Sequence, residues 1–316
     1  MQSILSFGAD VDSRFIVVAC AARSFAPCKV ANERKAIARW LRGVPHGTRL
    51  GMESTGSYHE LLADLAYKAG LRVFVINPRH LRRYAEGVGR RGKTDRIDAE
   101  VIARYIAREH AELHAYTPPT KEQRKLAQLM SRRANLVKAK DSVGQSLRGL
   151  SCIERERREL VARIDRTIAK LELLIQRVLT QVPGAKRAAE HIETIPGFGR
   201  LTSTYLAHRF TRLPYARGDA AVAQTGLDPR PDDSGKRHGR RKLSKAGPSE
   251  QRRLLFNCGR VAARTAVWRP YYEAQLAKGL STTAAAVILA RKMVRVAFAL
   301  YKNERPFDAS YLVSHG

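Results

Sequence analysis

Four carboxylate side chains lie where acids can do chemistry. The segment GRRGKTDRIDAEVIARYI, residues 89–106, places Asp95 and Asp98 three residues apart. Residues three apart in a helix share a face, so both carboxylates can reach one point. Asp10 ends the apolar segment ILSFGAD, and Glu53 lies near the end of the apolar segment LGMES. A charge at the end of such a strand is either solvated or used in a site.

Each of these acids also has an ordinary structural explanation. Acids in the first turn of a helix are favoured by the helix dipole, and Thr94 or Asp95 would serve as the N-cap. Asp10 and Glu53 would be solvated acids at strand ends. The functional interpretation therefore requires that all four carboxylates converge.

Convergence would create a site for a divalent metal. Like charges a few Å apart repel and raise one another's pKa, so four carboxylates need a cation between them. Ligands that are all oxygen suit Mg²⁺ or Mn²⁺. Two such ions about 4 Å apart activate a nucleophile and stabilise the leaving oxygen of a phosphodiester. The basic residues beside the acids would hold a phosphate backbone, or form a solvated surface: Arg90, Arg91, Lys93 and Arg96.

The first 110 residues show the element order β-β-β-α-β-α-β-α. We expect strands at 3–11, 14–22, 28–30, 48–54 and 71–78, and helices at 32–43, 59–70, 79–86 and 95–109. This order is that of a ribonuclease-H-like domain, in which strands one and four are neighbours and the last helix crosses them. Asp10, Glu53, Asp95 and Asp98 would then converge from three elements that are distant in sequence.

The middle of the chain is expected to be almost entirely helical. TPPT at 117–120 ends the α/β pattern, and residues 121–182 follow with a break near Gly149. Such a break would allow an antiparallel hairpin of two long helices. Apolar residues recur there at steps of mostly three and four, which is typical of a coiled-coil seam: Leu160, Ile164, Ile168, Leu171, Ile175, Val178 and Val182. The alternative is a helix packed on its own domain.

The last third is expected to be mainly α-helical. IETIPGFGRLTSTYLAHRF, residues 192–210, predicts a helix-hairpin-helix pattern in which Gly197 and Gly199 let backbone N–H groups approach a phosphate. A plain turn between helices is the alternative. The segment 226–248 is loop-like, rich in Gly, Pro, Lys and Arg.

We expect two more apolar helices, at 249–265 and 281–301, to close the fold. The predicted fold class is therefore α/β followed by α. Its expected domains are 1–116, a RuvC-like catalytic domain, 117–184, a long-helix region, and 185–316, a C-terminal domain.

The charge of the chain predicts a polyanionic partner. Lys and Arg number 58 against 29 Asp and Glu, a formal net charge of +29. Nucleic acid is the commonest such partner, and no strongly basic amphipathic anchor points to a membrane surface. The sequence has no apolar run of transmembrane length and no signal-peptide pattern. Its four cysteines lack CxxC spacing, which argues against a zinc site or disulfides and fits a reducing cytoplasm.

The same residues carry a resemblance to a known family. GADV around Asp10, MESTGSYHELLADLAYKAGLRVFVINPRHLRRYA around Glu53, and GRRGKTDRIDAEVIARY resemble the DEDD transposases of insertion-sequence family 110. That family includes a 1111 subgroup, which MESTGSYHELL favours, and the Piv-type DNA invertases. The resemblance continues through IPGFGRLTSTYL and AQTGLDPRPDDSGKRHGRRKLSKAGPSEQRRLLF, and so covers nearly the whole chain.

The resemblance implies a transposase with two sets of catalytic residues. The RuvC-like domain would hold metal on the four acids, and a coiled coil would connect it to a C-terminal transposase domain with a nucleophilic serine. The matching position is Ser234, in DDSGK, preceded by Asp233 where the family often has a small residue. Attack of its hydroxyl on phosphorus would give a phosphoserine linkage to DNA. Basic residues that would neutralise the phosphates are Lys236, Arg237, Arg240 and Arg241.

The resemblance also implies partners. A structured noncoding RNA from the element would guide the enzyme to donor and target DNA, in the cytoplasm and at the nucleoid of a bacterial cell. The chain would act as a homodimer that assembles into a tetramer, and the seam around Leu171 and Ile175 offers a route for that assembly.

Two other functions are compatible with the residues. A RuvC-like, structure-selective endonuclease resembling a Holliday-junction resolvase would use the same four acids with water as nucleophile, leaving Ser234 idle. The long C-terminal third argues against it. A non-catalytic nucleic-acid-binding protein is the third hypothesis, in which Asp10→Ala changes only stability or charge.

Overall fold

The computed structural model of the 316-residue chain forms two compact units, residues 1–118 and 119–316. The structure describes residues 4–22, 25–54, 56–89, 92, 94–230, 233–234, 237–238 and 242–313, with the backbone alone at 233–234 and 237–238. The expected division into three domains stays a prediction. The two units are described separately below.

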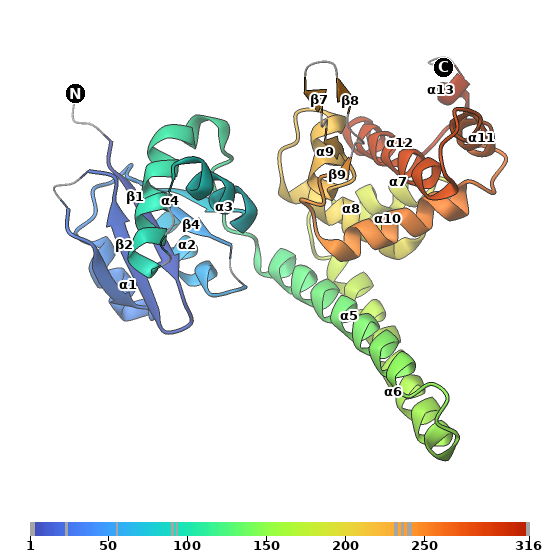
Figure 1. The fold of residues 1–316 in the computed structure, drawn as a ribbon, viewed down its shortest axis with the longest axis horizontal. Coiled ribbons are helices and arrows are strands. Elements are labelled where there is room, and N and C mark those ends of the chain that lie inside the picture. Colours follow the sequence, from blue (N-terminus) through green and yellow to red (C-terminus); the bar gives the residue numbers. More distant parts are fainter. Residues whose placement is uncertain are drawn as a thin grey trace. The chain divides into compact units, whose positions relative to one another are not determined.

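A mixed five-stranded sheet forms the centre of the first unit (Figure 1). Its strands are β1 (Ser6–Val11), β2 (Phe15–Cys20), β3 (Cys28–Ala31), β4 (Arg49–Glu53) and β5 (Arg72–Ile76), in the order β3-β2-β1-β4-β5. β1 pairs antiparallel with β2 and parallel with β4, and β5 continues the parallel half. The predicted adjacency of strands one and four is therefore confirmed.

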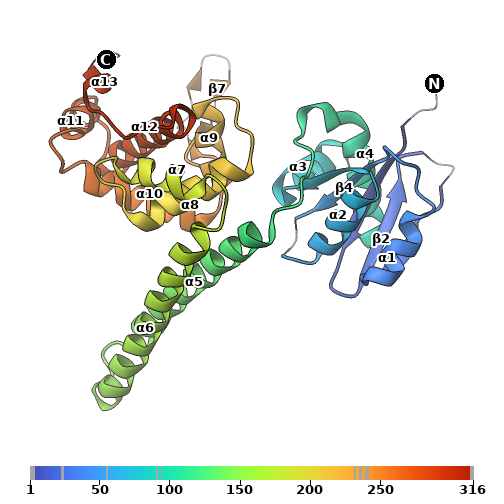
Figure 2. The ribbon, with the colours of Figure 1, turned by 180° about the vertical axis from the view of Figure 1, so that it is seen from behind.

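Helices cover both faces of this sheet. α1 (Arg34–Leu41) and α2 (His59–Lys68) lie on one face, and α4 (Asp95–Glu109) crosses the other, with α3 (Pro78–Gly87) packed beside α4 (Figures 1 and 2). Successive residues of a strand point to opposite faces. The odd positions of β1, from Phe7 to Val11, pack in the core with α1 and α2, which turns Gly8 and Asp10 toward α4.

α4 approaches the sheet so closely that glycine is required beneath it. A Cβ on Gly8 would lie 2.2 Å from the carbonyl oxygen of Ala99, and a Cβ on Gly51 would lie 2.3 Å from Cγ1 of Ile106. These two glycines are paired neighbours on β1 and β4. Together they form a flat track that fixes the height of α4 above the central strands.

Two long helices open the second unit. α5 (Lys121–Ser146) and α6 (Glu154–Leu179) pack side by side as a hairpin, and Gly149 in their connection has φ +83°. Arg133 pairs with Glu172 and Lys140 with Asp165, so steps of seven residues run in opposite directions on the two helices. That register defines an antiparallel hairpin within one chain.

The predicted seam of α6 is therefore used inside the chain. Ile168, Ile175, Val178 and Val182 are buried, and Ile175 is completely inaccessible. From Ile175 onward these residues share one core with Leu126 and Met130 of α5 and with the C-terminal helices. Leu160, near the far end of the hairpin, is 44% exposed. The expectation that Ile175 joins two copies is wrong, because that side chain is buried in the core of its own chain. For Leu171 the expectation stays a prediction.

A buried guanidinium ties the hairpin to the C-terminal helices. Arg133 on α5, only 12% exposed, pairs with Glu172 on α6 and with Glu250 on α10, each at 2.8 Å. Glu250 is 7% exposed and is also paired with Arg253. The hydroxyl of Tyr205 adds a hydrogen bond to the carbonyl of Met130 at 2.9 Å.

The rest of the second unit is mainly helical, as predicted. Its helices are α7 (Ala185–Glu193), α8 (Arg200–Arg212), α9 (Gly218–Thr225), α10 (Ser249–Ala262), α11 (Arg269–Ala277), α12 (Thr282–Asn303) and α13 (Ser310–Val313). A short 3-10 helix lies at Ser151–Ile153 in this unit, and another lies at His110–Glu112 in the first unit. The sequence analysis did not predict α9, α11 or α13, which are short.

The segment 226–248 is not a plain loop. β6 (Pro229–Arg230) pairs antiparallel with β9 (Lys242–Leu243), and β7 (Asp233–Ser234) pairs antiparallel with β8 (Arg237–His238). Strands of two residues give too little alternation to be recognised in a sequence. Among the helices that the structure describes, each is too short or too polar to cross a bilayer.

Candidate functional site

Asp10 and Glu53 sit at adjacent strand ends on the face of the sheet that α4 covers. The parallel register pairs Gly8 with Gly51 and Ala9 with Met52, so the next pair along is Asp10 and Glu53. Both acids lie two residues beyond the glycine track, and alternation turns them to the same face. The strand ends thus bring one carboxylate from each central strand to the same edge.

α4 adds the other two acids from above. Thr94 is its N-cap: the Thr94 hydroxyl accepts a hydrogen bond from the backbone N–H of Ile97 at 3.3 Å. Asp95 is then the first helical residue, which settles the choice left open by the sequence. Asp95 and Asp98 share the stripe of α4 that continues through Ile102 to Ile106, the stripe that packs on the glycine track. At its N-terminal end, one turn before Ile102, this stripe lies near the end of β1, where Asp10 is.

The charge state of Asp10 reflects this arrangement. The pKa of Asp10 is raised to about 6, first by burial and then by the neighbouring carboxylates of Asp98, Asp95 and Glu53, in that order. The other three predicted acids therefore lie within electrostatic reach of Asp10, although the four come from three separate elements. A smaller contribution in the same direction comes from Asp12.

The donor set suits a hard divalent cation. Its members supply oxygen ligands only, and a cation would relieve the repulsion that raises the pKa of Asp10. Within the described residues, no three His, Cys, Asp or Glu side chains stand close enough to form a finished metal site. Carboxylates without a cation between them repel, so an open arrangement is the expected one. The nearness of the four acids and the oxygen chemistry fit a metal, and their side chains would have to rotate inward to bind it.

Asp12 is the acid that the sequence analysis did not select. It lies on the turn between β1 and β2, where its N–H donates to the carbonyl of Phe15 at 2.9 Å. The side-chain amide of Asn32 donates to the carbonyls of Asp12 and Tyr58, at 2.9 and 3.2 Å. Asn32 thereby fastens the turn after β1 to the segment after β4. The sequence signal that could have identified Asp12 is its position two residues after Asp10, at the end of the predicted strand.

The predicted phosphate-binding residues of this unit are only partly described. Arg96 lies between the two acids of α4 and pairs with Glu100 at 3.1 Å, with its side chain 68% exposed. Arg90, Arg91 and Lys93 lie outside the described residues. Their role beside the carboxylates stays a prediction.

The PGFG turn has a packing explanation for one of its glycines. Gly197 has φ +97°, and a Cβ there would lie 2.6 Å from Cβ of Ala262 on α10. The indole N–H of the fully buried Trp268 donates to the carbonyl of Pro196 at 3.0 Å. Gly199, by contrast, is the exposed N-cap of α8 with open space at its Cβ position. Of the two predicted phosphate contacts, only Gly199 is accessible in this way.

Ser234 lies on a small hairpin whose base is firmly held. The backbone register pairs Ser234 with Arg237, while Lys236, Arg240 and Arg241 lie outside the described residues. At the base, the Ser244 hydroxyl donates a short hydrogen bond to the Asp228 carboxylate, and the N–H of Ser244 donates to the Asp228 carbonyl at 2.9 Å. The Ser244–Asp228 pair therefore closes the segment that carries the predicted nucleophile.

Comparison with known proteins adds a family to this geometry. Residues 8–150 match a family model of IS110-type DEDD proteins described as a transposase, and residues 189–273 match the transposase IS116/IS110/IS902 family. The chain is similar to the pilin gene-inverting proteins of Moraxella bovis and Moraxella lacunata, at 26% identity over 284 residues and 85% of each chain. It is also similar to the transposase for insertion sequence element IS1328 of Yersinia enterocolitica, at 27% identity over 285 residues. That similarity covers 79% of this chain and 82% of the relative.

Proposed function

The chain belongs to the IS110 family of transposases, and from that premise we propose that it cuts and rejoins DNA strands through a serine-linked intermediate. The observation that carries the proposal is the gathering of Asp10, Glu53, Asp95 and Asp98 around one strand end, which the raised pKa of Asp10 reports. Repelling acids of this kind are kept together in a protein when a cation uses them.

We assign Mg²⁺ or Mn²⁺ to these four carboxylates. When bound, such an ion stabilises negative charge on phosphodiester oxygens. The protein's own contribution is positional: the glycine track under α4 and the Asn32 hydrogen bonds hold the acids at the edge of the sheet. The closed base of the Ser234 hairpin, with Asp228 and Ser244, holds the nucleophile's segment.

The proposed reaction balances without an external energy source. The Ser234 hydroxyl attacks a phosphodiester phosphorus and loses its proton, a bond from phosphorus to Oγ forms, and the bond to one sugar oxygen breaks. That sugar oxygen leaves as a hydroxyl by taking up a proton. Attack by another strand's hydroxyl reverses the sequence and frees the serine.

The partners that we propose are donor and target DNA and a structured guide RNA from the element. Their support is the family membership together with the net charge of +29, which suits binding to phosphate backbones. Guidance by base pairing would leave the protein to recognise shape and backbone. A homodimer that assembles to a tetramer completes the proposal.

The decisive test is recovery of the protein under denaturing conditions from cells that carry its gene with both native flanks. We expect DNA covalently attached to the wild type and absent from Ser234→Ala and from Asp98→Ala. Ser310→Ala, at the start of α13, is the matched control and should retain the adduct. Cleaved DNA without an adduct, unaffected by Ser234→Ala, would instead indicate the hydrolytic RuvC-like endonuclease. If Asp98→Ala retains both cleavage and the adduct, the proposed role of the carboxylates is contradicted.

A further inference from the structure

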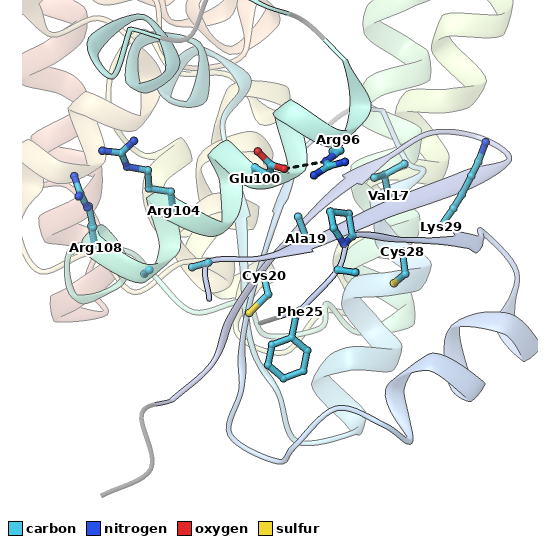
Figure 3. Close-up of a pocket in the computed structure, with 14 residues that line it drawn as sticks. Val17, Ala19, Cys20, Phe25, Cys28, Lys29, Arg96, Glu100, Arg104 and Arg108 are labelled. Carbon is cyan, nitrogen blue, oxygen red and sulfur yellow. Dashed lines mark hydrogen bonds and ion pairs between the residues drawn. The ribbon is translucent and has the colours of Figure 1, made fainter. Parts of the chain in front are cut away.

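A basic groove runs along the flank of α4, on the same sheet face as the four carboxylates (Figure 3). Its volume is about 1040 Å³. α4 forms one wall, and described residues of β2, β3 and the segments next to them, within 17–21 and 25–29, form the floor and the other wall. Neither the catalytic proposal nor the sequence analysis uses this groove.

The wall of the groove is a stripe of arginines. Arg96, Arg104 and Arg108 follow one another at steps of eight and four residues, which keeps them on one flank of α4. With a rise of about 1.5 Å per residue, the stripe is roughly 18 Å long. It starts between Asp95 and Asp98 and ends in the last turn of the helix.

These arginines are available to a ligand. Within the described part of the chain, Arg104 and Arg108 form no ion pair, while Arg96 is held by Glu100 at 3.1 Å on an exposed surface. An exposed pair of that kind is weak and is readily exchanged for a phosphate. Figure 3 shows the Arg104 and Arg108 side chains extending from α4.

The side chains on the floor nearest α4 are small and uncharged, apart from Lys29. Val17 and Ala19 face α4 because they pair with Asp10 and Gly8, which point to that face. Lys29, on β3, is the register partner of Val17 on β2 and adds a fourth cation to the groove. The side chains of Cys20 and Phe25 turn away from α4, and Phe25 packs against Phe7 on the other face. The floor therefore offers room for a backbone, and Phe25, which is 44% exposed, is the aromatic side chain among the described residues that line the groove.

The groove is continuous with the carboxylate edge. The sheet register runs Glu53, Asp10, Val17, Lys29 across four adjacent strands, and Val17 already lines the groove. Since neighbouring strands lie about 4.8 Å apart, Asp10 is roughly one strand away from the groove floor. A chain of phosphates that lies against the arginine stripe leads directly to the acids.

We propose that this groove holds a single strand of nucleic acid by its phosphates and guides it to or from the carboxylate site. This inference rests on the proposed function, but its test measures binding of an oligonucleotide and requires no catalysis. A volume of about 1040 Å³ over a length of roughly 18 Å leaves a cross-section of roughly 60 Å². A cross-section of that size is roughly 8 Å across, which is narrower than the major groove of a duplex alone, about 12 Å wide, so a single strand is the form that fits.

The test is a thiol footprint in the full-length protein. Ala107→Cys places a thiol between Arg104 and Arg108, and the exposed Cys152, on the hairpin of the second unit, is the internal control. Maleimide modification of each thiol is followed by mass spectrometry, with and without a saturating single-stranded twelve-nucleotide DNA or RNA. EDTA is present throughout, so neither a metal nor cleavage is involved. We expect the oligonucleotide to protect position 107 and not Cys152.

A matched pair of double variants assigns the protection. Arg104→Ala/Arg108→Ala should abolish it and lower the salt slope of oligonucleotide binding by about 1.4, because each single-strand phosphate contact contributes about 0.7. Arg39→Ala/Arg42→Ala removes the same charge from exposed positions on and just after α1 and should leave the protection intact. Protection by DNA, by RNA or by both supports the groove and identifies its strand.

Unprotected Cys at position 107 with both oligonucleotides would overturn the proposal. Protection that persists in Arg104→Ala/Arg108→Ala would do so as well. The same footprint in Asp10→Asn separates this idea from the catalytic one. Protection there, with adduct formation unaffected by Asp10→Asn in cells, would preserve the groove and refute the catalytic role of the acids.

Discussion

Asp10 carries a charge that the folded chain tolerates poorly without a counter-ion. Its pKa is raised from 3.8 to about 6, first by burial and then by Asp98, Asp95 and Glu53. Because the folded state holds this proton more tightly than the unfolded state, stability falls as the pH rises from about 4 to 6. Above pH 6 the full cost is present; one pKa unit corresponds to about 1.4 kcal/mol, and solvent screening at this partly exposed carboxylate keeps the cost below that conversion.

The first prediction concerns Asp10→Asn in metal-free protein. We expect the variant to unfold at higher denaturant concentration than the wild type at pH 7.5, and to match it at pH 4. Adding Mn²⁺ at a hundred times its Kd should stabilise the wild type by about 2.7 kcal/mol and the variant much less. Asp141→Asn, an exposed residue of α5, is the control. Equal stability of Asp10→Asn and wild type at pH 7.5 would show that the four acids are not gathered.

His208 provides a pH signal in the second unit. It is 8% exposed on α8, and burial, with Arg209 and Arg212, lowers its pKa to about 4. The folded state therefore keeps the imidazole neutral, so stability is lost as the pH falls from 6.5 toward 4. In urea unfolding of the second unit, His208→Gln should remove this loss, whereas His191→Gln, at a partly exposed position on α7, should not. An unchanged pH profile in His208→Gln would contradict the buried neutral state.

At the scale of elements, the close packing of α4 on the sheet decides whether the four acids come together. Gly8 has no room for a side chain, with the carbonyl oxygen of Ala99 and the N–H of Ala103 within 2.3 Å of a built Cβ. Gly8→Ala should therefore lift α4, cost about 1–3 kcal/mol of stability through overpacking and lower strand cleavage. Gly144→Ala in α5 meets nothing within 4 Å and should be neutral or stabilise by up to about 1 kcal/mol. Thermal melts of both variants, read with the adduct assay, test this; normal cleavage in Gly8→Ala would contradict it.

At the scale of the whole molecule, the hairpin of α5 and α6 leaves apolar side chains outside. Leu173 is 73% exposed and Leu174 is 40% exposed, while Ile175 beside them is fully buried. If copies of the chain associate through this hairpin, the contact must use the outer leucines. Leu173→Asp/Leu174→Asp should then lower the mass in light scattering without changing the melting temperature.

Ile175→Ala is the opposite case and separates assembly from folding. It should cost about 2–5 kcal/mol as a cavity in the core of the second unit and leave the oligomeric mass of the folded fraction unchanged. A wild-type mass retained by Leu173→Asp/Leu174→Asp would exclude the hairpin as the route to the proposed dimer.

Much of the first unit follows from local patterns in the sequence. Alternation along β1 and β4 places Asp10 and Glu53 on one face, and the three-residue spacing of Asp95 and Asp98 places both on one stripe of α4. The order of elements predicted that β1 and β4 are neighbours. Local periodicity suffices here because each acid is positioned by its own strand or helix, and the resemblance to insertion-sequence transposases supplied Ser234.

Other features depend on contacts between distant segments, which the sequence does not encode locally. An apolar seam predicts that α6 has a partner, but the turn at Gly149 and the pairs from Arg133 and Lys140 decide that this partner is α5 of the same chain. The predicted contact of Gly197 with a phosphate stays a prediction, but its packing against Ala262, which requires a glycine there, could not be seen in the sequence. Likewise, the groove beside α4 exists only because the sheet register sets Val17 and Lys29 next to Asp10. Residue type and spacing determined which side chains could act, whereas tertiary packing decided which of them meet.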